Sequence, residues 1–287
     1  MAFGTQIRTW FDGSWHDGDV PVMRAADHGM WQGSSVFDGA RRFEGATPDL
    51  DAHCARLNRS AEALMIRPTM APEAIEDLIH EGLEGFAPDE AVYIRPMYWA
   101  IHGSKLGVAP SQEETGFAVC LEAVPMHAPD ATTTVTTTRF RRPVQEDAVV
   151  GAKAGCLYPN NARMLVEAQR KGFGNALSTD AMGNLAESAT SNVFLVKDGE
   201  VLTPIANGTF LAGITRARHM ANLAADGTPV REAVLTFDDV RDADEVFLSG
   251  NLTKVTPVTA FDDRQYQVGP VTRRVREMYW DWALSAR

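Results

Sequence analysis

Lys153 lies in a run of small and β-branched residues, from Asp147 to Gly155, which is an unusual place for a charged side chain. A strand of such residues would direct the ammonium toward the protein interior, where a buried charge is costly. A desolvated lysine tends to lose its proton, and the neutral amine is a nucleophile that forms Schiff bases with aldehydes. Because a lysine on a glycine-flanked loop can also extend to water, the residues that follow decide between these interpretations.

Complementary chemistry follows Lys153 along the chain. Tyr158 lies five positions on and Glu187 thirty-four positions on, which adds a phenol and a carboxylate. A helical pattern comes next, and the backbone N–H groups of Ile214 and Thr215 at its start would face an anion such as phosphate. Pyridoxal 5'-phosphate requires such a set, namely an amine for its aldehyde, an anion cradle and a carboxylate that keeps its ring nitrogen protonated.

At these residues the chain resembles the fold-class IV pyridoxal-phosphate enzymes, and among them it is most similar to the branched-chain aminotransferases. The similarity runs over nearly the whole chain in the same order. The matching blocks are Gly33–Arg41, Arg56–Ala61, Tyr93–Pro96, Leu106–Val108, Ala152–Gly155, Glu187, Gly213–Arg216 and Asp244–Gly250. The resemblance implies the two-domain α+β architecture shared by the D-amino acid and branched-chain aminotransferases.

The resemblance also implies roles toward the cofactor. Lys153 would attach the cofactor and, once displaced by the substrate amine, carry the proton between the substrate Cα and the cofactor. Glu187 would pair with the pyridine N–H, and Tyr158 would donate to the phenolic oxygen. The structural alternatives are a capping or surface glutamate and a core tyrosine.

Four residues are expected near the phosphate by the same resemblance. Arg56 matches the phosphate-binding arginine, and Ile214 and Thr215 complete the cradle unless they only begin an ordinary capped helix. Asn251 stands where the branched-chain enzymes commonly have threonine, which preserves hydrogen bonding but changes the contact to phosphate and substrate carboxylate.

Apolar and charged residues are implied for the substrate pocket. Phe37, Leu106 and Val108 match apolar positions that would suit an aliphatic side chain. Arg95 matches the arginine associated with the distal carboxylate of glutamate, and Tyr93 matches a tyrosine near the substrate carboxylate.

Arg41 and Leu252 complete the expected substrate-binding set, and Gln32 departs from it. The branched-chain enzymes typically carry a tyrosine at the position of Gln32. An amide in place of an aromatic ring opens space and adds a donor and an acceptor, so the pocket would admit a bulkier or more polar acid.

The composition is that of a soluble globular protein, with 287 residues of which 45% are hydrophobic and 23% charged. A net charge of −11 opposes nucleic-acid binding, and the arginines at 139, 141 and 142 are interpreted as a solvated edge. The scattered histidines form no metal-ligating motif, so no metal is expected.

Three cysteines far apart in sequence favour a reducing compartment. The first eight residues lack a charged start followed by an apolar stretch, and no run of residues is apolar enough to span a membrane. The sequence therefore predicts a cytoplasmic protein without a membrane partner.

Two domains and a linker are expected along the chain. Residues 1–124 read as a small α+β domain, with a hairpin at Asp12-Gly13 and helices over 49–66 and 72–85. Residues 125–131 read as a linker, and residues 132–287 as the larger, cofactor-binding domain.

The leading hypothesis is an aminotransferase that moves the amino group of a hydrophobic, branched-chain-like L-amino acid to 2-oxoglutarate by a ping-pong mechanism. Alternatives of the same fold class are a D-amino acid or (R)-amine transaminase and an aminodeoxychorismate lyase, and a cofactor carrier without turnover is a third class. The partners would be small amino and 2-oxo acids. The resemblance implies at least a homodimer, because the family completes its pocket across a subunit interface.

Overall fold

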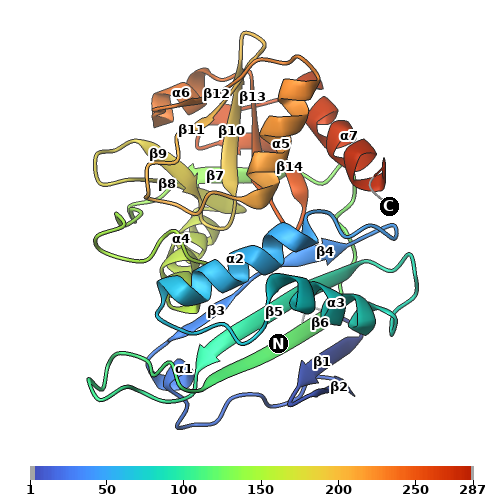
Figure 1. Ribbon diagram of the computed structural model, residues 1–287. Coiled ribbons are helices and arrows are strands. Elements are labelled where there is room, and N and C mark those ends of the chain that lie inside the picture. The colour runs from blue at the N-terminus through green and yellow to red at the C-terminus, as the bar shows by residue number, and fades with distance from the viewer. Residues whose placement is uncertain (1–3, 286–287) are drawn as a thin grey trace. The chain divides into compact units, whose positions relative to one another are not determined.

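The computed structural model describes residues 4–285, which form two compact units (Figure 1). The first unit runs to Met126 and includes Ala152–Cys156, and the second consists of His127–Gly151 and Leu157–Ser285. The first three residues, inspected above for a leader, lie outside this range. No helix within it is long and apolar enough to cross a membrane.

The first unit is built on an antiparallel sheet that has six strands in the described part of the chain, in the order β2-β1-β6-β5-β3, with β4 also pairing with β5. Helices α2 and α3 pack against the strands of this sheet (Figure 1). The elements are β1 (Ile7–Phe11), β2 (Ser14–Asp17), α1 (His28–Trp31), β3 (Ser35–Phe37), β4 (Ala40–Arg42), α2 (Leu50–Ala63), α3 (Pro72–Leu83), β5 (Val92–Ala100) and β6 (Thr115–Ala123).

Local sequence explains the hairpin that opens this unit. Asp12 and Gly13 both have positive φ, 52° and 80°, as a two-residue hairpin turn of type I′ requires. Trp10 then pairs with Trp15 across β1 and β2. The predicted hairpin and the two predicted helices are confirmed.

The second unit contains a mixed sheet with nine strands in the described residues, in the order β12-β11-β10-β13-β14-β7-β8-β9, with β15 on β14. Three pairings are parallel, those of β7 with β8, β7 with β14, and β11 with β12. The elements are β7 (Thr133–Thr137), α4 (Tyr158–Arg170), β8 (Asn175–Thr179), β9 (Leu185–Ser188), β10 (Asn192–Lys197), β11 (Glu200–Pro204), α5 (Ile214–Ala225), β12 (Val230–Ala233), α6 (Phe237–Asp242), β13 (Glu245–Gly250), β14 (Lys254–Phe261), β15 (Arg264–Gln265) and α7 (Pro270–Ser285), with a 3-10 turn, η1 (Gly155–Leu157), before α4.

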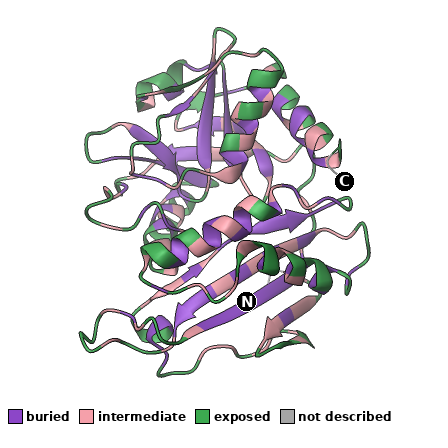
Figure 2. Ribbon diagram, viewed as in Figure 1, coloured by how far each residue is buried: buried purple, intermediate pink, exposed green. Residues whose placement is uncertain are grey.

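Strand β10 is buried on both faces, which explains its continuous apolar sequence (Figure 2). Val193 and Leu195 belong to the cluster that includes Val240 of α6. Phe194 belongs to a second cluster with residues of α5 and α7, and its ring stacks on Phe247 at 4.9 Å between centroids. The sheet is therefore covered on both sides, and its strand ends are held at fixed positions.

Lys153 differs from its prediction in two respects. Its segment is not a strand, since only one isolated bridge joins Ala154 to Val36. It also belongs to the first unit, although residues 132–287 were expected to form one domain. The reason is a tertiary contact, because the Phe37 N–H donates to the Lys153 carbonyl at 3.1 Å.

Arg42 tests the packing of the first unit. This buried guanidinium donates to the carbonyls of Leu83, Ala87 and Glu90, and so satisfies the end of α3 and the loop after it. We expect Arg42→Met to lower the free energy of unfolding by about 2 to 3 kcal/mol, because buried carbonyls lose a charged donor. Urea unfolding measures this. Arg59→Met, at an exposed position of α2, should change stability little, and equal losses would contradict the assignment.

Candidate active site

Lys153 is held by its backbone within the first unit. Its carbonyl accepts from Phe37 as described, and its own N–H donates to the Ser60 hydroxyl at 3.1 Å. The ammonium lies 4.9 Å from the centroid of the Phe37 ring, and the residue is half-buried. A lysine clamped at the backbone with its amine against an aromatic ring is pre-positioned for chemistry at Nζ.

Arg56 is oriented by a buried carboxylate. Its Nε and Nη2 donate to the two oxygens of Asp38 at 2.7 and 2.8 Å, and His53 Nδ1 lies 2.7 Å from the same carboxylate. Burial alone would raise the pKa of Asp38, but the Arg56 charge and hydrogen bonds, aided by His53, hold this pKa well below its usual range. Asp38 and His53 are positioning residues that the sequence did not reveal. The phosphate role of Arg56 stays a prediction.

Arg95 pairs with a second buried carboxylate. Its Nη2 lies 2.5 Å from Glu122 Oε1, and its guanidinium lies 5.2 Å from the Tyr93 ring centroid. Burial would lower the pKa of Arg95, but the Glu122 carboxylate raises it overall. The side chain of Arg95 is 27% exposed and that of Glu122 only 2%, so the arginine also faces outward from the pair.

Phe37 and Arg95 share one cavity of the first unit. It has a volume of about 240 Å³, and its lining is mostly apolar. The lining residues are Val22, Met23, Ser35, Val36, Phe37, Arg95, Met97, Tyr98 and Trp99. An apolar wall with one guanidinium suits either an aliphatic side chain or an acid of similar length.

Arg41 lies fully buried on β4. Its Nη2 donates to the Val124 carbonyl at 2.6 Å, whereas Nε and Nη1 have no hydrogen-bond partner among the described residues. Burial lowers the pKa of Arg41 to about 10, against the opposing effect of Tyr93. A buried cation with donors that no protein group uses fits the expected substrate-binding role, which stays a prediction.

The other expected pocket residues of this unit are exposed. Leu106 and Val108, on the loop between β5 and β6, are 82% and 73% exposed, and Gln32 is exposed after α1. They are not among the residues that line the cavity with Phe37. The loop is anchored, since His28 Nε2 lies 3.2 Å from the Gly107 carbonyl.

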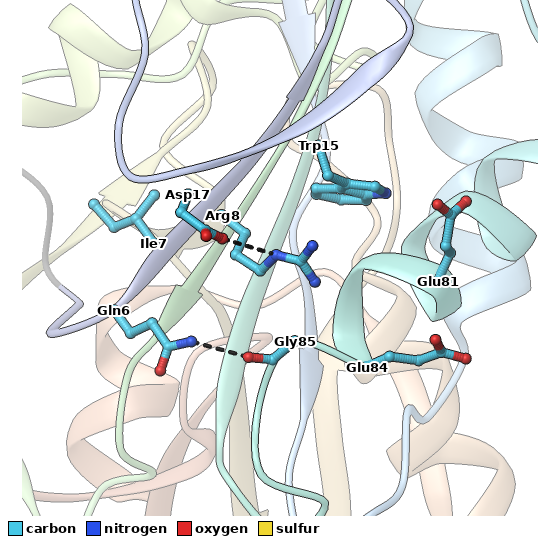
Figure 3. A pocket seen from close by; sticks show the side chains of 8 residues that line it. All are labelled: Gln6, Ile7, Arg8, Trp15, Asp17, Glu81, Glu84 and Gly85. Carbon is cyan, nitrogen blue, oxygen red and sulfur yellow. Dashed lines mark hydrogen bonds and ion pairs between the residues drawn. The ribbon is translucent and has the colours of Figure 1, made fainter.

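A second hollow of the first unit, of about 570 Å³, is lined by other residues (Figure 3). Arg8 lies between Asp17, at 3.4 Å, and the Trp15 ring, at 5.4 Å from its centroid. Glu81 and Glu84 also line it, and none of the residues predicted to do chemistry is among its lining.

Glu187 is a buried carboxylate of the second unit. It lies on β9, and its Oε1 is 2.9 Å from Arg142 Nη2. Asn192 donates to Oε2 at 3.3 Å, and Arg142 also donates to Asn161 Oδ1 at 2.6 Å. The interpretation of Arg142 as part of a solvated edge is therefore wrong. Its guanidinium is buried because it compensates the charge of Glu187.

Asn192 joins Glu187 to the start of α5. Its Oδ1 accepts from the Gly213 N–H at 3.1 Å, and its amide nitrogen also donates to the Leu211 carbonyl at 3.0 Å. A Cβ at Gly213 would lie 2.3 Å from Asn192 Oδ1, so only glycine fits there. The N–H groups in the first turn of α5, including those of Ile214 and Thr215, have no acceptor within the helix. Because Asn192 contacts both groups, it fixes this turn relative to the Glu187 carboxylate.

The turn between β13 and β14 lies beside the start of β10, the strand that begins at Asn192. Asn192 pairs with Ser249, the residue before Gly250, and Gly250 packs closely on Ser191. The turn itself carries Asn251, which is half-buried, and Leu252, which is 44% exposed. The structure thus brings together Glu187, the start of α5 and the Asn251 turn within the second unit. Tyr158, at the first position of α4, is half-buried in the same unit.

Arg142 and Glu187 allow a direct test of the buried pair. We expect Arg142→Met to lower the free energy of unfolding by about 3 to 5 kcal/mol, because Glu187 loses its main compensating charge. The double variant Arg142→Met with Glu187→Leu should recover much of that loss. Urea unfolding of the three proteins measures the coupling. Strictly additive losses would contradict a compensating pair.

Comparison with known proteins shows the family of the chain. The class IV amino-transferase family model matches residues 35–261. An aminotransferase from Brucella abortus, solved with bound PLP, is 56% identical, covers 97% of this chain and 99% of its own, and has a TM-score of 0.95.

Branched-chain aminotransferases are more distant relatives. The enzyme of the thermophilic archaeon Thermoproteus uzoniensis, solved with norvaline, is 26% identical, with coverage of 98% of this chain and 95% of its own and a TM-score of 0.89. The enzyme of Escherichia coli strain K12 is 29% identical over 288 residues, which are 94% of this chain and 91% of its own. The chain belongs to the class IV aminotransferases.

Proposed function

We propose that this aminotransferase uses pyridoxal 5'-phosphate to move the amino group of a hydrophobic, branched-chain-like L-amino acid to 2-oxoglutarate by a ping-pong mechanism. The observation that carries the proposal is the amide of Asn192, which joins the Glu187 carboxylate to the first turn of α5. A carboxylate and a phosphate-binding helix start, fixed to each other, suit the ring nitrogen and the phosphate of one cofactor.

The residues present fit the cofactor by their chemistry. When bound, the cofactor supplies an electron sink for the electrons left at the substrate α-carbon. Lys153 offers the amine that attaches it and later moves the proton at the α-carbon, and Glu187 keeps the ring nitrogen protonated. Tyr158 would donate to the phenolic oxygen, and Arg56 and the N–H groups at the start of α5 would each suit a phosphate.

The substrate assignment is supported by the first unit. The cavity shared by Phe37 and Arg95 has an apolar wall for a branched side chain and a guanidinium for the distal carboxylate of glutamate or 2-oxoglutarate. Arg41 supplies buried donors that no protein group uses. Tyr93 interacts electrostatically with Arg41, and its ring centroid lies 5.2 Å from the Arg95 guanidinium. D-amino acids, (R)-amines and aminodeoxychorismate are the alternative substrates of the fold class, and a panel of donors separates them.

The assembly proposed is at least a homodimer. Leu106 and Val108 are large apolar side chains exposed on the described chain, which supports a role at a second subunit. The cytoplasmic location and the restriction to small-molecule partners, without nucleic acid, remain proposals based on the free cysteines and the acidic composition.

Lys153→Ala tests the cofactor attachment. We expect the purified variant to lose covalent attachment and turnover while its thermal unfolding is little changed, because alanine suits the small-residue segment. Borohydride reduction followed by peptide mass spectrometry should place the phosphopyridoxyl group on Lys153 of the wild type. The matched control is Lys197→Ala at a surface lysine, which should be labelled normally. A label on another lysine in wild type would refute the assignment.

Arg95 and Glu122 test the substrate pocket as a pair. We expect Arg95→Ala to reduce kcat/KM for 2-oxoglutarate by roughly tens-fold or more, while leucine as donor loses much less, because leucine has no second carboxylate. Glu122→Gln keeps the Arg95 guanidinium and removes only its carboxylate partner, so this variant should retain most of its kcat/KM for 2-oxoglutarate. Half-reaction rates with leucine and with glutamate measure the contrast. If both variants weaken all substrates equally, Arg95 only braces β5 against β6.

A further inference from the structure

Lys254 is a lysine whose side chain is fully buried. It begins β14, pairs with Gly250 across the β13–β14 turn, and has a left-handed backbone with φ of 64°. Its ammonium donates to Asn251 Oδ1 at 2.7 Å and lies 5.6 Å from the Tyr279 ring centroid. A buried ammonium is costly, so a specific use is the natural explanation for it.

The contact fixes which way the Asn251 amide points. An ammonium has donors and no acceptor, so the atom that faces Lys254 must be the amide oxygen. The amide nitrogen then points away from the lysine. Asn251 Nδ2 is buried and has no hydrogen-bond partner among the described residues. An oriented and buried donor of this kind needs an acceptor that the described residues do not supply.

The backbone of Lys254 is held in place as well. His219 Nε2, from α5, lies 3.1 Å from the Lys254 carbonyl, and since a carbonyl only accepts, the imidazole is the donor. Burial lowers the pKa of His219 to about 4, with a partly opposing effect of this hydrogen bond. At neutral pH His219 is therefore an uncharged donor that secures the turn without a second positive charge.

The turn lies where an anion is expected. Gly250 packs on Ser191, next to Asn192, whose side chain binds Glu187 and the start of α5. The first turn of α5, the Lys254 ammonium and the Asn251 N–H all favour negative charge at this end of the sheet.

We propose that Lys254 is a positioning residue that orients Asn251, so that the amide nitrogen of Asn251 donates to an anionic oxygen of a bound molecule. This inference rests on the proposed function. The oxygen belongs either to the cofactor phosphate or to the substrate carboxylate, and the two sources share the same acceptor chemistry. Lys254 acts through Asn251 and does not itself touch the reacting atoms.

Binding to the cofactor-free protein tests the proposal. The variants are Lys254→Met, Asn251→Ala, their double variant, and Thr272→Val as a control for a buried polar change in the same unit. If the acceptor is phosphate, Lys254→Met should weaken the binding of pyridoxal 5'-phosphate by roughly tenfold or more and leave the binding of pyridoxal unchanged. If the acceptor is the substrate carboxylate, cofactor affinity should hold, and the loaded variant should bind 4-methylvaleric acid more weakly by a similar factor.

The double variant separates positioning from packing. Because Lys254 acts through Asn251, the double variant should lose no more affinity than Asn251→Ala alone. Losses that multiply, or a Lys254→Met protein that binds both ligands as Thr272→Val does, would overturn the proposal. A wild-type protein that takes up no cofactor would instead overturn the proposed function, which distinguishes the two failures. Thermal unfolding of each apo variant identifies any loss that is due to misfolding.

Discussion

A carboxylate taken out of water must be given a partner, and three arginines serve that requirement beside the residues expected to do chemistry. Asp38 is paired with Arg56, Glu122 with Arg95, and Glu187 with Arg142. In each pair the carboxylate is less than a tenth exposed, so removing the arginine would leave a buried negative charge. The same pairs also fix the direction of the guanidinium or carboxylate that a ligand would meet.

In the second unit, side-chain amides also orient the charged groups. Asn192 holds Glu187 at one end and the start of α5 at the other, and Asn251 is itself oriented by Lys254. An amide offers a donor and an acceptor in one rigid plane, so it can connect two groups of opposite hydrogen-bonding character. Amide contacts of this kind give the proposed anion-binding edge of the second unit its geometry.

Local patterns in the sequence predicted those parts of the fold that depend on local physics. The Asp12-Gly13 turn and helices α2 and α3 follow from residue type and period alone. The family blocks likewise predicted the class IV fold, which the comparisons confirm. Helices α6 and α7 were not predicted from the sequence.

The partners of the site residues could not be read from the sequence, since they are distant along the chain. Arg142 was interpreted as a surface charge, because its burial depends on Glu187, 45 residues away. The Arg95–Glu122 pair had a usable signal, since Tyr93 pairs with Glu122 and Arg95 with Cys120 once β5 and β6 are set antiparallel. Lys254 gave no signal, because its neighbours are distant along the chain: the Tyr279 ring lies beside its ammonium and the His219 imidazole contacts its carbonyl.

The absorption spectrum of the cofactor-loaded protein tests the central claim most directly. L-leucine added without any 2-oxo acid should convert the band of lysine-attached cofactor into that of the pyridoxamine form, and 2-oxoglutarate should then restore it. D-leucine should leave the spectrum nearly unchanged. A protein that carries the cofactor but shows no conversion with L-leucine, or converts with D-leucine instead, would contradict an L-amino acid aminotransferase.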